Sequence, residues 1–378
     1  MKVLHITPSY YPATYWGGPI WSTKAICDGI AALPDVDLRV LTTDAAGPQV
    51  NDRVQPTMLP YPVHYARRIA GHSVAPGLLA RLPSAIAWAD IVHLSATYSP
   101  PVLPSLGLAK LLGKPVVWSP RGALQATADW AGAPHQHAKQ MFEKAANMLR
   151  PAQTVLHVTA AQEGAQSIRR LGDITTVTIA NSVDIPAANL VRNRVDGQCR
   201  LMVLGRLHPK KGLIELFDAV AQLPDVFSLD VYGTGDAAFT AALHDKAAQL
   251  RGRVRMHGHV DGAAKAAAFA DADLFVLPSH SENFGIAVAE AMAHSLPVLT
   301  TTATPWAEVD LVGCGRCIDL AQADLVQEIM DLSQRDLIAM GARARDWMRR
   351  DFSAEAMVAA FAVLYRDMVA SEPARVSA

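Results

Sequence analysis

The stretch Ser281-Glu282-Asn283-Phe284-Gly285-Ile286-Ala287-Val288-Ala289-Glu290-Ala291-Met292-Ala293 joins a predicted strand to a predicted helix. An apolar run, Ala272 to Leu277, ends at Pro278 just before it, and the residues from Ile286 to Ala293 have helical periodicity. Ligands of open α/β sheets bind at the edge where parallel strands lead into helices. The stretch therefore predicts an α/β sheet with a ligand site at this edge.

Two carboxylates, Glu282 and Glu290, stand on either side of the Asn-Phe-Gly turn. Glu282 precedes the helix and Glu290 lies about one and a half turns inside it, so both can reach one extended ligand. A helix that starts near Gly285 offers free backbone N–H groups and a positive dipole end to a diphosphate, while the glutamates can accept hydrogen bonds from vicinal hydroxyls. The alternative is an exposed capping acid and a solvated charge on the helix surface.

A second segment of the same kind precedes it, Gly205-Arg206-Leu207-His208-Pro209-Lys210-Lys211-Gly212. It follows the buried-strand pattern of Leu201 to Leu204 and leads into the amphipathic run from Leu213 to Leu223. Cations at a strand end, bracketed by glycines and placed before a helix start, suit an anionic leaving group.

Together these segments resemble family 4 of the retaining glycosyltransferases, which have the GT-B fold. The resemblance spans nearly the whole chain in the expected order, and it says little about which sugar is moved. The motifs that carry it are Thr7-Pro8, Tyr10-Tyr11-Pro12, Gly17-Gly18-Pro19, Ser119-Pro120-Arg121-Gly122, Asn181-Ser182-Val183-Asp184, Gly205-Arg206, Lys211-Gly212, Pro278-Ser279, Glu282-Asn283-Phe284-Gly285, Glu290-Ala291, Pro297-Val298 and Thr304-Pro305-Trp306.

The order of strands and helices predicts two Rossmann-like α/β domains with doubly wound parallel sheets, because short, uniformly apolar runs alternate with helical patterns. The predicted division is residues 1–184, a polar linker over 185–198 and a second domain over 199–352. A C-terminal helix over 353–370 has one apolar face. The resemblance implies a cleft between the domains, with the first on the acceptor side and the second on the donor side, and a last helix that crosses back to the first domain.

The resemblance implies a donor that is a nucleotide diphosphate sugar and a reaction that retains the anomeric configuration. Arg206 and Lys211 would then be the counter-charges of the departing diphosphate, where negative charge accumulates in the transition state. Glu290 would accept from the ribose hydroxyls and Glu282 would contact the donor hexose. The backbone N–H groups of residues 283–286, from Asn283 through Phe284 and Gly285 to Ile286, would hold sugar and phosphate.

Gly17 and Gly18 lie in the loop after the first predicted strand, where the absence of side chains allows the backbone to approach a phosphate or an acceptor. The alternative is a plain strand-to-helix connection, because Pro19 suits the first position of a helix.

Arg121 stands where many similar proteins have a histidine near the donor sugar, and a subset of them shares the arginine. An arginine stays protonated and cannot act as a base, so we expect an electrostatic role toward the diphosphate or an anionic acceptor. The alternative is a surface or ion-paired arginine.

Asp271-Ala272-Asp273 has the Asp-x-Asp spacing of a divalent-metal site, but it opens the strand at the end opposite the ligand edge. We therefore expect no metal and no other cofactor. His257 and His259 alternate along a strand exit and are interpreted as surface histidines or neighbours of the nucleotide base. Cys314-Gly315-Arg316-Cys317 has redox or metal-ligand spacing, yet no second cysteine pair completes a zinc site, so packing is the favoured interpretation.

Bulk properties limit the partners of the chain. It has 378 residues, 51% of them hydrophobic and 18% charged, and a formal net charge of -1, which argues against a nucleic-acid partner. Residues 1–183 carry 15 Lys and Arg against 10 Asp and Glu, and the remainder carry 19 against 25. The basic first half could face an acidic acceptor or an anionic membrane.

The segment from Arg67 to Trp88 combines cations with large apolar residues. It is compatible with peripheral contact to anionic lipid, and equally with a helix whose apolar face turns into the core. The start of the chain reads as a strand without the apolar core of a signal peptide, and no apolar run approaches the roughly 20 residues of a membrane span. We expect a cytoplasmic protein, with the inner face of the membrane as the alternative site.

The leading hypothesis is a retaining, metal-independent glycosyltransferase that moves a hexose-type sugar to a glycan or lipid-linked acceptor in polysaccharide or glycoconjugate biosynthesis. A sugar-nucleotide epimerase on the same scaffold and a non-catalytic sugar-nucleotide-binding protein are the alternatives. The nucleotide base, the sugar, the acceptor and the oligomeric state are not encoded in any motif of the chain.

Overall fold

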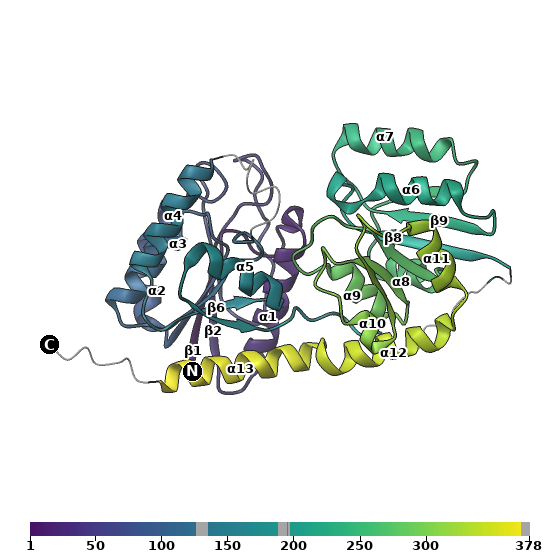
Figure 1. Cartoon of the computed structure of the whole chain (residues 1–378). Coiled ribbons are helices and arrows are strands. Elements are labelled where there is room, and N and C mark those ends of the chain that lie inside the picture. The colour runs from purple at the N-terminus through teal and green to yellow at the C-terminus, as the bar shows by residue number, and fades with distance from the viewer. Residues whose placement is uncertain (126–134, 188–194, 196, 372–378) are drawn as a thin grey trace. The chain divides into compact units, whose positions relative to one another are not determined.

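The computed structural model of the chain describes residues 1–125, 135–187, 195 and 197–371. It divides into two compact units, residues 1–182 with 354–378 and residues 183–353 (Figure 1). The predicted linker begins in the second unit, and its residues 188–194 and 196 lie outside the described part.

The described residues of the first unit form a seven-stranded sheet in the order β3-β2-β1-β4-β5-β6-β7, with every neighbouring pair parallel. The strands are β1 (Lys2–Ile6), β2 (Asp37–Thr43), β3 (Val63–Ala66), β4 (Ile91–Ser95), β5 (Val116–Ser119), β6 (Thr154–Val158) and β7 (Thr175–Thr178). The helices are η1 (Thr14–Trp16), α1 (Gly18–Ala31), α2 (Pro76–Trp88), α3 (Val102–Leu111), α4 (Gln136–Leu149), α5 (Ala161–Leu171) and α13 (Ala354–Ala370).

Helices cover both faces of this sheet. Apolar residues of α2, α3, α4 and α5 share one core cluster with alternate strand residues such as Leu4 and Val92. Residues of α1 and α13 share another cluster with the intervening strand residues, such as Val3 and Ile91. Because both faces are buried, the strands read as continuous apolar runs in the sequence.

The described residues of the second unit form a six-stranded parallel sheet in the order β10-β9-β8-β11-β12-β13. Its strands are β8 (Cys199–Leu204), β9 (Phe227–Tyr232), β10 (Val254–Gly258), β11 (Leu274–Leu277), β12 (Val298–Thr301) and β13 (Gly315–Ile318). Its helices are η3 (Pro209–Lys211), α6 (Leu213–Gln222), α7 (Ala237–Ala248), α8 (Gly262–Asp271), α9 (Ile286–Ala293), α10 (Val309–Val312), α11 (Leu325–Ser333) and α12 (Leu337–Asp351).

Both sheets reverse their winding direction next to the first strand, at β1/β4 in one unit and at β8/β11 in the other. Such switch points leave a crevice at the carboxyl ends of the two adjacent strands. The prediction of two doubly wound parallel α/β units is confirmed. In the described part of the chain, no helix combines the length and apolar character needed to cross a bilayer.

Candidate functional site

The two sequence segments that carry most of the predicted site lie at the switch point of the second unit. The loop from Gly205 to Gly212 follows β8, and the loop from Pro278 to Gly285 follows its neighbour β11. Gly212 has a φ of +66°, and a Cβ there would lie 2.0 Å from the carbonyl oxygen of Pro278. Only glycine therefore lets the two loops approach this closely.

An ion pair joins the two loops. Lys211 Nζ donates to Glu282 Oε1, and the two side chains are only 14% and 10% exposed. The N–H of His280 donates to the carbonyl of Lys210 at 2.7 Å, and the Ser279 hydroxyl lies 2.9 Å from the same oxygen. These contacts fix the pair at the carboxyl ends of β8 and β11.

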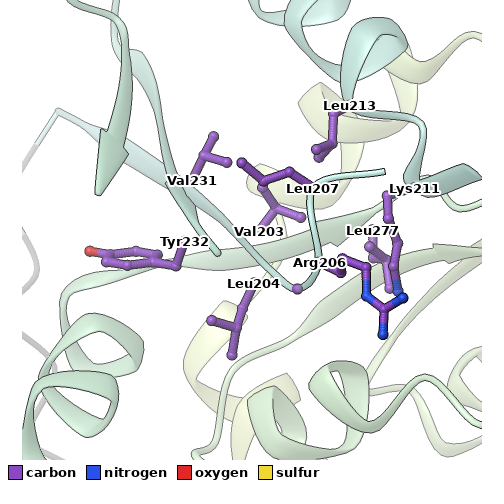
Figure 2. Close-up of a pocket in the computed structure, with 10 residues that line it drawn as sticks. Val203, Leu204, Arg206, Leu207, Lys211, Leu213, Val231, Tyr232 and Leu277 are labelled. Carbon is purple, nitrogen blue, oxygen red and sulfur yellow. The ribbon is translucent and has the colours of Figure 1, made fainter. Parts of the chain in front are cut away.

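A pocket opens beside this pair, with Arg206 and Lys211 on its wall (Figure 2). Figure 2 shows both side chains extending from the β8 loop on the same side of the pocket, whereas Tyr232 lies across it at the end of β9. The remaining lining residues are Val203, Leu204, Gly205, Leu207, Leu213, Val231 and Leu277. Two cations therefore stand at the mouth of an otherwise apolar lining, at the carboxyl end of β8.

Helix α9 begins beside Glu282. Its N-cap, Gly285, has a φ of +72°, and the indole N–H of Trp306 donates to the Phe284 carbonyl at 2.6 Å. A Cβ on Gly285 would lie 3.2 Å from that indole nitrogen. The left-handed glycine thus lets Asn283, Phe284 and Ile286 follow one tight turn into the helix. The first N–H groups of a helix have no carbonyl partner within it, and they are suited to an anion.

Glu290 lies in α9 and has a different partner from Glu282. Lys265 Nζ of α8 donates to Glu290 Oε1 at 2.8 Å, and both side chains are part-exposed. A carboxylate held by one ammonium group keeps lone pairs for further donors. Lys265 was not singled out in the sequence, because an isolated lysine in an alanine-rich helix gives no signal about its partner.

Arg121 belongs to the first unit and follows β5. It has a φ of +55°, and its guanidinium donates to Asn181 Oδ1 at 3.2 Å and to Thr23 Oγ1 at 3.4 Å. Burial lowers the pKa of Arg121, and the charge of Glu163 opposes that shift. The Glu163 carboxylate also accepts from the N–H of Gly122 at 2.7 Å, so α5 holds the loop that carries Arg121. The side chain is therefore engaged within its own unit.

Gly17 and Gly18 connect η1 to α1, as expected from Pro19 at the helix start. Gly17 is the N-cap with a φ of +72°, and Gly18 is the first residue of the helix. A Cβ built on Gly18 would meet no atom within 4 Å. The space above this backbone is open to a ligand.

The Asp-x-Asp motif lies at the amino end of β11, as expected. Asp273 accepts from the backbone N–H of Arg200 at 2.9 Å, and the Arg200 guanidinium lies 3.5 Å from Asp273 and 3.9 Å from Asp271. An arginine thus stands where a metal ion would. Among the described residues, no group of three or more His, Cys, Asp or Glu is placed to hold a metal.

The two neighbouring histidines differ in their contacts. His257 Nε2 lies 2.6 Å from Asp230 Oδ1, and its ring stacks on Tyr232 with centroids 4.5 Å apart. His259 is exposed and lies 3.5 Å from Asp261. Tyr232 connects this cluster to the pocket of Figure 2.

The cysteine pair has no bond between its sulfur atoms. Burial raises the pKa of the Cys314 thiol to about 12 and that of Cys317 to about 11. Because the thiolate is the reactive form, both residues are poor nucleophiles. This supports the packing interpretation.

The segment from Arg67 to Trp88 is buried along one face only, and Arg67, Ile69, Leu79 and Arg81 are exposed. Arg68 is fully buried and donates to backbone carbonyls, including that of Gly47 at 2.9 Å. The α2 residues Leu78, Leu82 and Ile86 are buried. The guanidinium carbon of Arg39 lies over the Trp88 ring, 3.9 Å from the ring centroid.

The chain is similar to known proteins in both sequence and fold. Residues 191–332 match the family described as "Glycosyl transferases group 1". The chain is 33% identical to a phosphatidyl-myo-inositol mannosyltransferase of Mycolicibacterium smegmatis over 181 residues, 45% of this chain and 46% of that protein. It is 30% identical to a D-inositol 3-phosphate glycosyltransferase of Xylanimonas cellulosilytica over 217 residues, 54% of this chain and 51% of that protein.

The matches thus span about half the length of these curated relatives. In fold, the chain is similar to Anabaena Alr3699/HepE, solved in complex with UDP, with a TM-score of 0.72, 17% identity and coverage of 97% of this chain and 100% of that one. The chain therefore has the GT-B fold, and its second unit matches the group 1 glycosyl transferases over residues 191–332.

Proposed function

We propose that this protein is a retaining, metal-independent glycosyltransferase that moves a hexose-type sugar from a nucleotide diphosphate sugar to a hydroxyl of a glycan or lipid-linked acceptor. The observation that carries the proposal is the part-buried Lys211–Glu282 pair beside Arg206, at the carboxyl ends of β8 and β11. It puts cations for a diphosphate next to a carboxylate for sugar hydroxyls.

In the proposed reaction, the bond between the anomeric carbon and the phosphate oxygen breaks while the acceptor oxygen bonds to the same face of that carbon. The electron pair leaves with the nucleoside diphosphate, and the acceptor proton passes to the departing phosphate oxygen. Arg206 and Lys211 stabilise the charge that develops on the leaving group. No step requires a metal or another cofactor.

The donor contacts follow the geometry of the second unit. Glu282 and Glu290 each keep lone pairs beyond their lysine contacts, so Glu282 accepts from the hexose and Glu290 from the ribose. The turn from Asn283 to Ile286 directs its N–H groups at sugar and phosphate. Arg121 contributes a positive charge to the field of the first unit, and Gly17 and Gly18 admit a ligand close to their backbone.

The names of the relatives support a role in glycolipid or polysaccharide synthesis. They are compatible with two classes of acceptor, glycans and lipid-linked acceptors. We place the acceptor at the first unit, whose half of the chain carries the positive charge excess. A peripheral position at the inner face of a membrane would bring a lipid-linked acceptor within reach.

The test is incubation of the purified chain with UDP-, GDP- and ADP-hexoses and a panel of glycan acceptors, with and without EDTA. We expect release of nucleoside diphosphate, a lengthened glycan with the anomeric configuration of the donor, and equal rates in EDTA. Glu290→Ala should lower the rate at least tenfold. An epimerised nucleotide sugar, or binding without turnover, would replace this proposal with one of the two alternatives.

A further inference from the structure

Two large aromatic side chains are left in water beside the glycines of the first unit. Tyr15 of η1 is 63% exposed and Trp21 in the first turn of α1 is 52% exposed. Each would gain roughly 25 cal/mol for every Å² that it buried, so their exposure forgoes stability. They lie in the segment that follows the carboxyl end of β1, the edge where ligands of such sheets bind.

Each exposed ring rests on a second, partly buried ring. Trp21 packs on Tyr11 with centroids 5.5 Å apart, and Tyr15 and Trp16 form a T-shaped contact with centroids 5.1 Å apart. Tyr11 and Trp16 both pack against the small core cluster that contains Ile20. The indole N–H of Trp16 also donates to the Ala45 carbonyl at 3.2 Å. The inner rings, Tyr11 and Trp16, are therefore held in place by the fold, and we call the four rings the aromatic shelf.

Gly17 and Gly18 lie between Trp16 and Trp21 in the sequence. The open space above Gly18 leaves the backbone between the rings uncovered. Aromatic faces carry partial negative charge and attract the partially positive C–H groups on one face of a pyranose. A sugar also needs hydrogen-bonding groups at its rim, which exposed backbone and the Tyr15 hydroxyl can supply.

The cation that contacts a ring of the shelf is compensated by a carboxylate, which favours a sugar over a membrane surface. Lys24 lies 5.2 Å from the Tyr11 ring centroid and pairs with Asp28 at 2.5 Å. That pair contributes no net positive charge, whereas binding to anionic lipid depends on several uncompensated lysines or arginines.

We propose that the aromatic shelf of Tyr11, Tyr15, Trp16 and Trp21 binds a pyranose ring of the acceptor, so that the acceptor is a saccharide. This inference rests on the proposed function and names its acceptor class. Tyr15 and Trp21 are the contact residues, while Tyr11 and Trp16 position them.

The experiment applies the full chain, without donor, to an array of immobilised oligosaccharides and to phosphatidylserine-containing vesicles. We expect retention on at least one pyranose oligosaccharide. Tyr15→Ala and Trp21→Ala should each lower that signal at least tenfold, and Trp21→Phe should keep most of it. Met141→Ala is the matched control, because Met141 is a large exposed side chain on α4 of the same unit. It should bind like the wild type.

Melting temperatures of all variants establish that they are folded. Three results would contradict binding of a pyranose by the shelf: the wild type binds no oligosaccharide, the alanine variants bind oligosaccharide as well as the wild type does, or the alanine variants lose binding to vesicles and keep binding to oligosaccharide. Transfer by the wild type is measured in parallel. Transfer that persists without shelf binding removes this inference alone, whereas absence of any transfer removes the proposed function.

Discussion

Lys211 is the residue on which the proposed donor site depends most. Its ammonium group neutralises Glu282 and lines the pocket with Arg206. Lys211→Ala leaves a poorly exposed carboxylate without its cation and removes a charge that the leaving diphosphate requires. We expect kcat/KM to fall at least tenfold, or about 1.4 kcal/mol of transition-state stabilisation.

Lys246→Ala is the control for this experiment, since it also deletes a lysine from an ion pair of the second unit, with Asp218 at 2.5 Å on the surface. Surface pairs contribute little to stability, and Lys246 lies on α7, away from the pocket lining. Steady-state kinetics should find the control at wild-type activity. Equal losses in both variants would show that the effect is not specific to the donor site.

A substitution at Gly18 can test ligand binding without disturbing the fold. A Cβ at this position meets nothing within 4 Å, and alanine forms helices better than glycine, so Gly18→Ala should leave the melting temperature equal or higher. If a ligand approaches this backbone, the added methyl group should raise the KM for donor or acceptor several-fold.

Gly77→Ala offers the matched comparison, because Gly77 lies in the first turn of α2 and also has free space around an added Cβ. Kinetics and thermal melting of both variants are measured together. A Gly18→Ala protein with wild-type KM for both substrates would leave Gly18 as a plain helix start.

At the scale of elements, the returning helix α13 is tied to the first sheet by a buried hydrogen-bond chain. His157 Nε2 lies 2.9 Å from the Ile179 carbonyl, which can only accept, so His157 Nδ1 must accept from the Ser119 hydroxyl at 2.6 Å. Ser119 then accepts from His93 Nε2 at 2.7 Å, and His93 Nδ1 accepts from the Tyr365 hydroxyl at 2.5 Å. One carbonyl thus fixes the tautomer of both neutral histidines.

The buried histidines of the first unit make its stability depend on pH. Burial lowers the pKa of His157 to about 3, as it does that of His5, and the charge of Arg121 acts in the same direction. The unfolded state, with an ordinary histidine pKa near 6.5, binds more protons below that pH. The stabilisation is therefore complete above about pH 6.5 and is lost progressively toward pH 3.

Urea unfolding of the protein between pH 4 and pH 8 tests this expectation. Each such histidine should contribute a slope of about 1.4 kcal/mol per pH unit within the window. His157→Asn should lower the slope by one histidine's share, whereas the exposed His259→Gln should leave it unchanged. If the free energy of unfolding of the wild type does not change between pH 7 and pH 4, the buried histidines are not held neutral as the hydrogen-bond chain requires.

Elements that are buried on both faces could be predicted from the sequence, and short edge elements could not. The bounds predicted for α9 agree with the structure, and the apolar run predicted as a strand ends at Leu277 as β11 does, because apolar or periodic runs define both elements. No pattern in the sequence predicts the four-residue strand β3. It is an edge strand with mostly half-buried residues, and it has neither an apolar run nor a clear alternation.

In the candidate site, too, the sequence predicts the positions of residues within their loops but not the contacts that depend on the packing of distant elements. Motif spacing places Arg206, Lys211 and Glu282 on adjacent strand ends, and there the structure brings Lys211 and Glu282 into contact. The pairing of Glu290 with Lys265 depends on how α8 packs beside α9, which no local pattern encodes. The inward contacts of Arg121 likewise depend on Thr23 and Asn181, residues distant in the sequence.

At the scale of the whole molecule, neither the near-zero net charge nor the acidic second half of the chain attracts an anionic donor over long range. The chain carries 34 Lys and Arg against 35 Asp and Glu, and its second half is acidic even though it contains the proposed diphosphate site. Affinity for an anion must then arise from the local contacts of Arg206, Lys211 and the start of α9.

Thermal melting with UDP, GDP and ADP tests this view of the molecule. A ligand that binds only the native state at 100 times its Kd adds about 2.7 kcal/mol, which corresponds to about 5 to 10 °C for a unit of this size. We expect one nucleoside diphosphate to give such a shift, the corresponding nucleoside to give little, and Lys211→Ala to reduce the shift strongly. An equal shift from nucleoside and diphosphate would assign the affinity to the base, and it would contradict a site built around the phosphates.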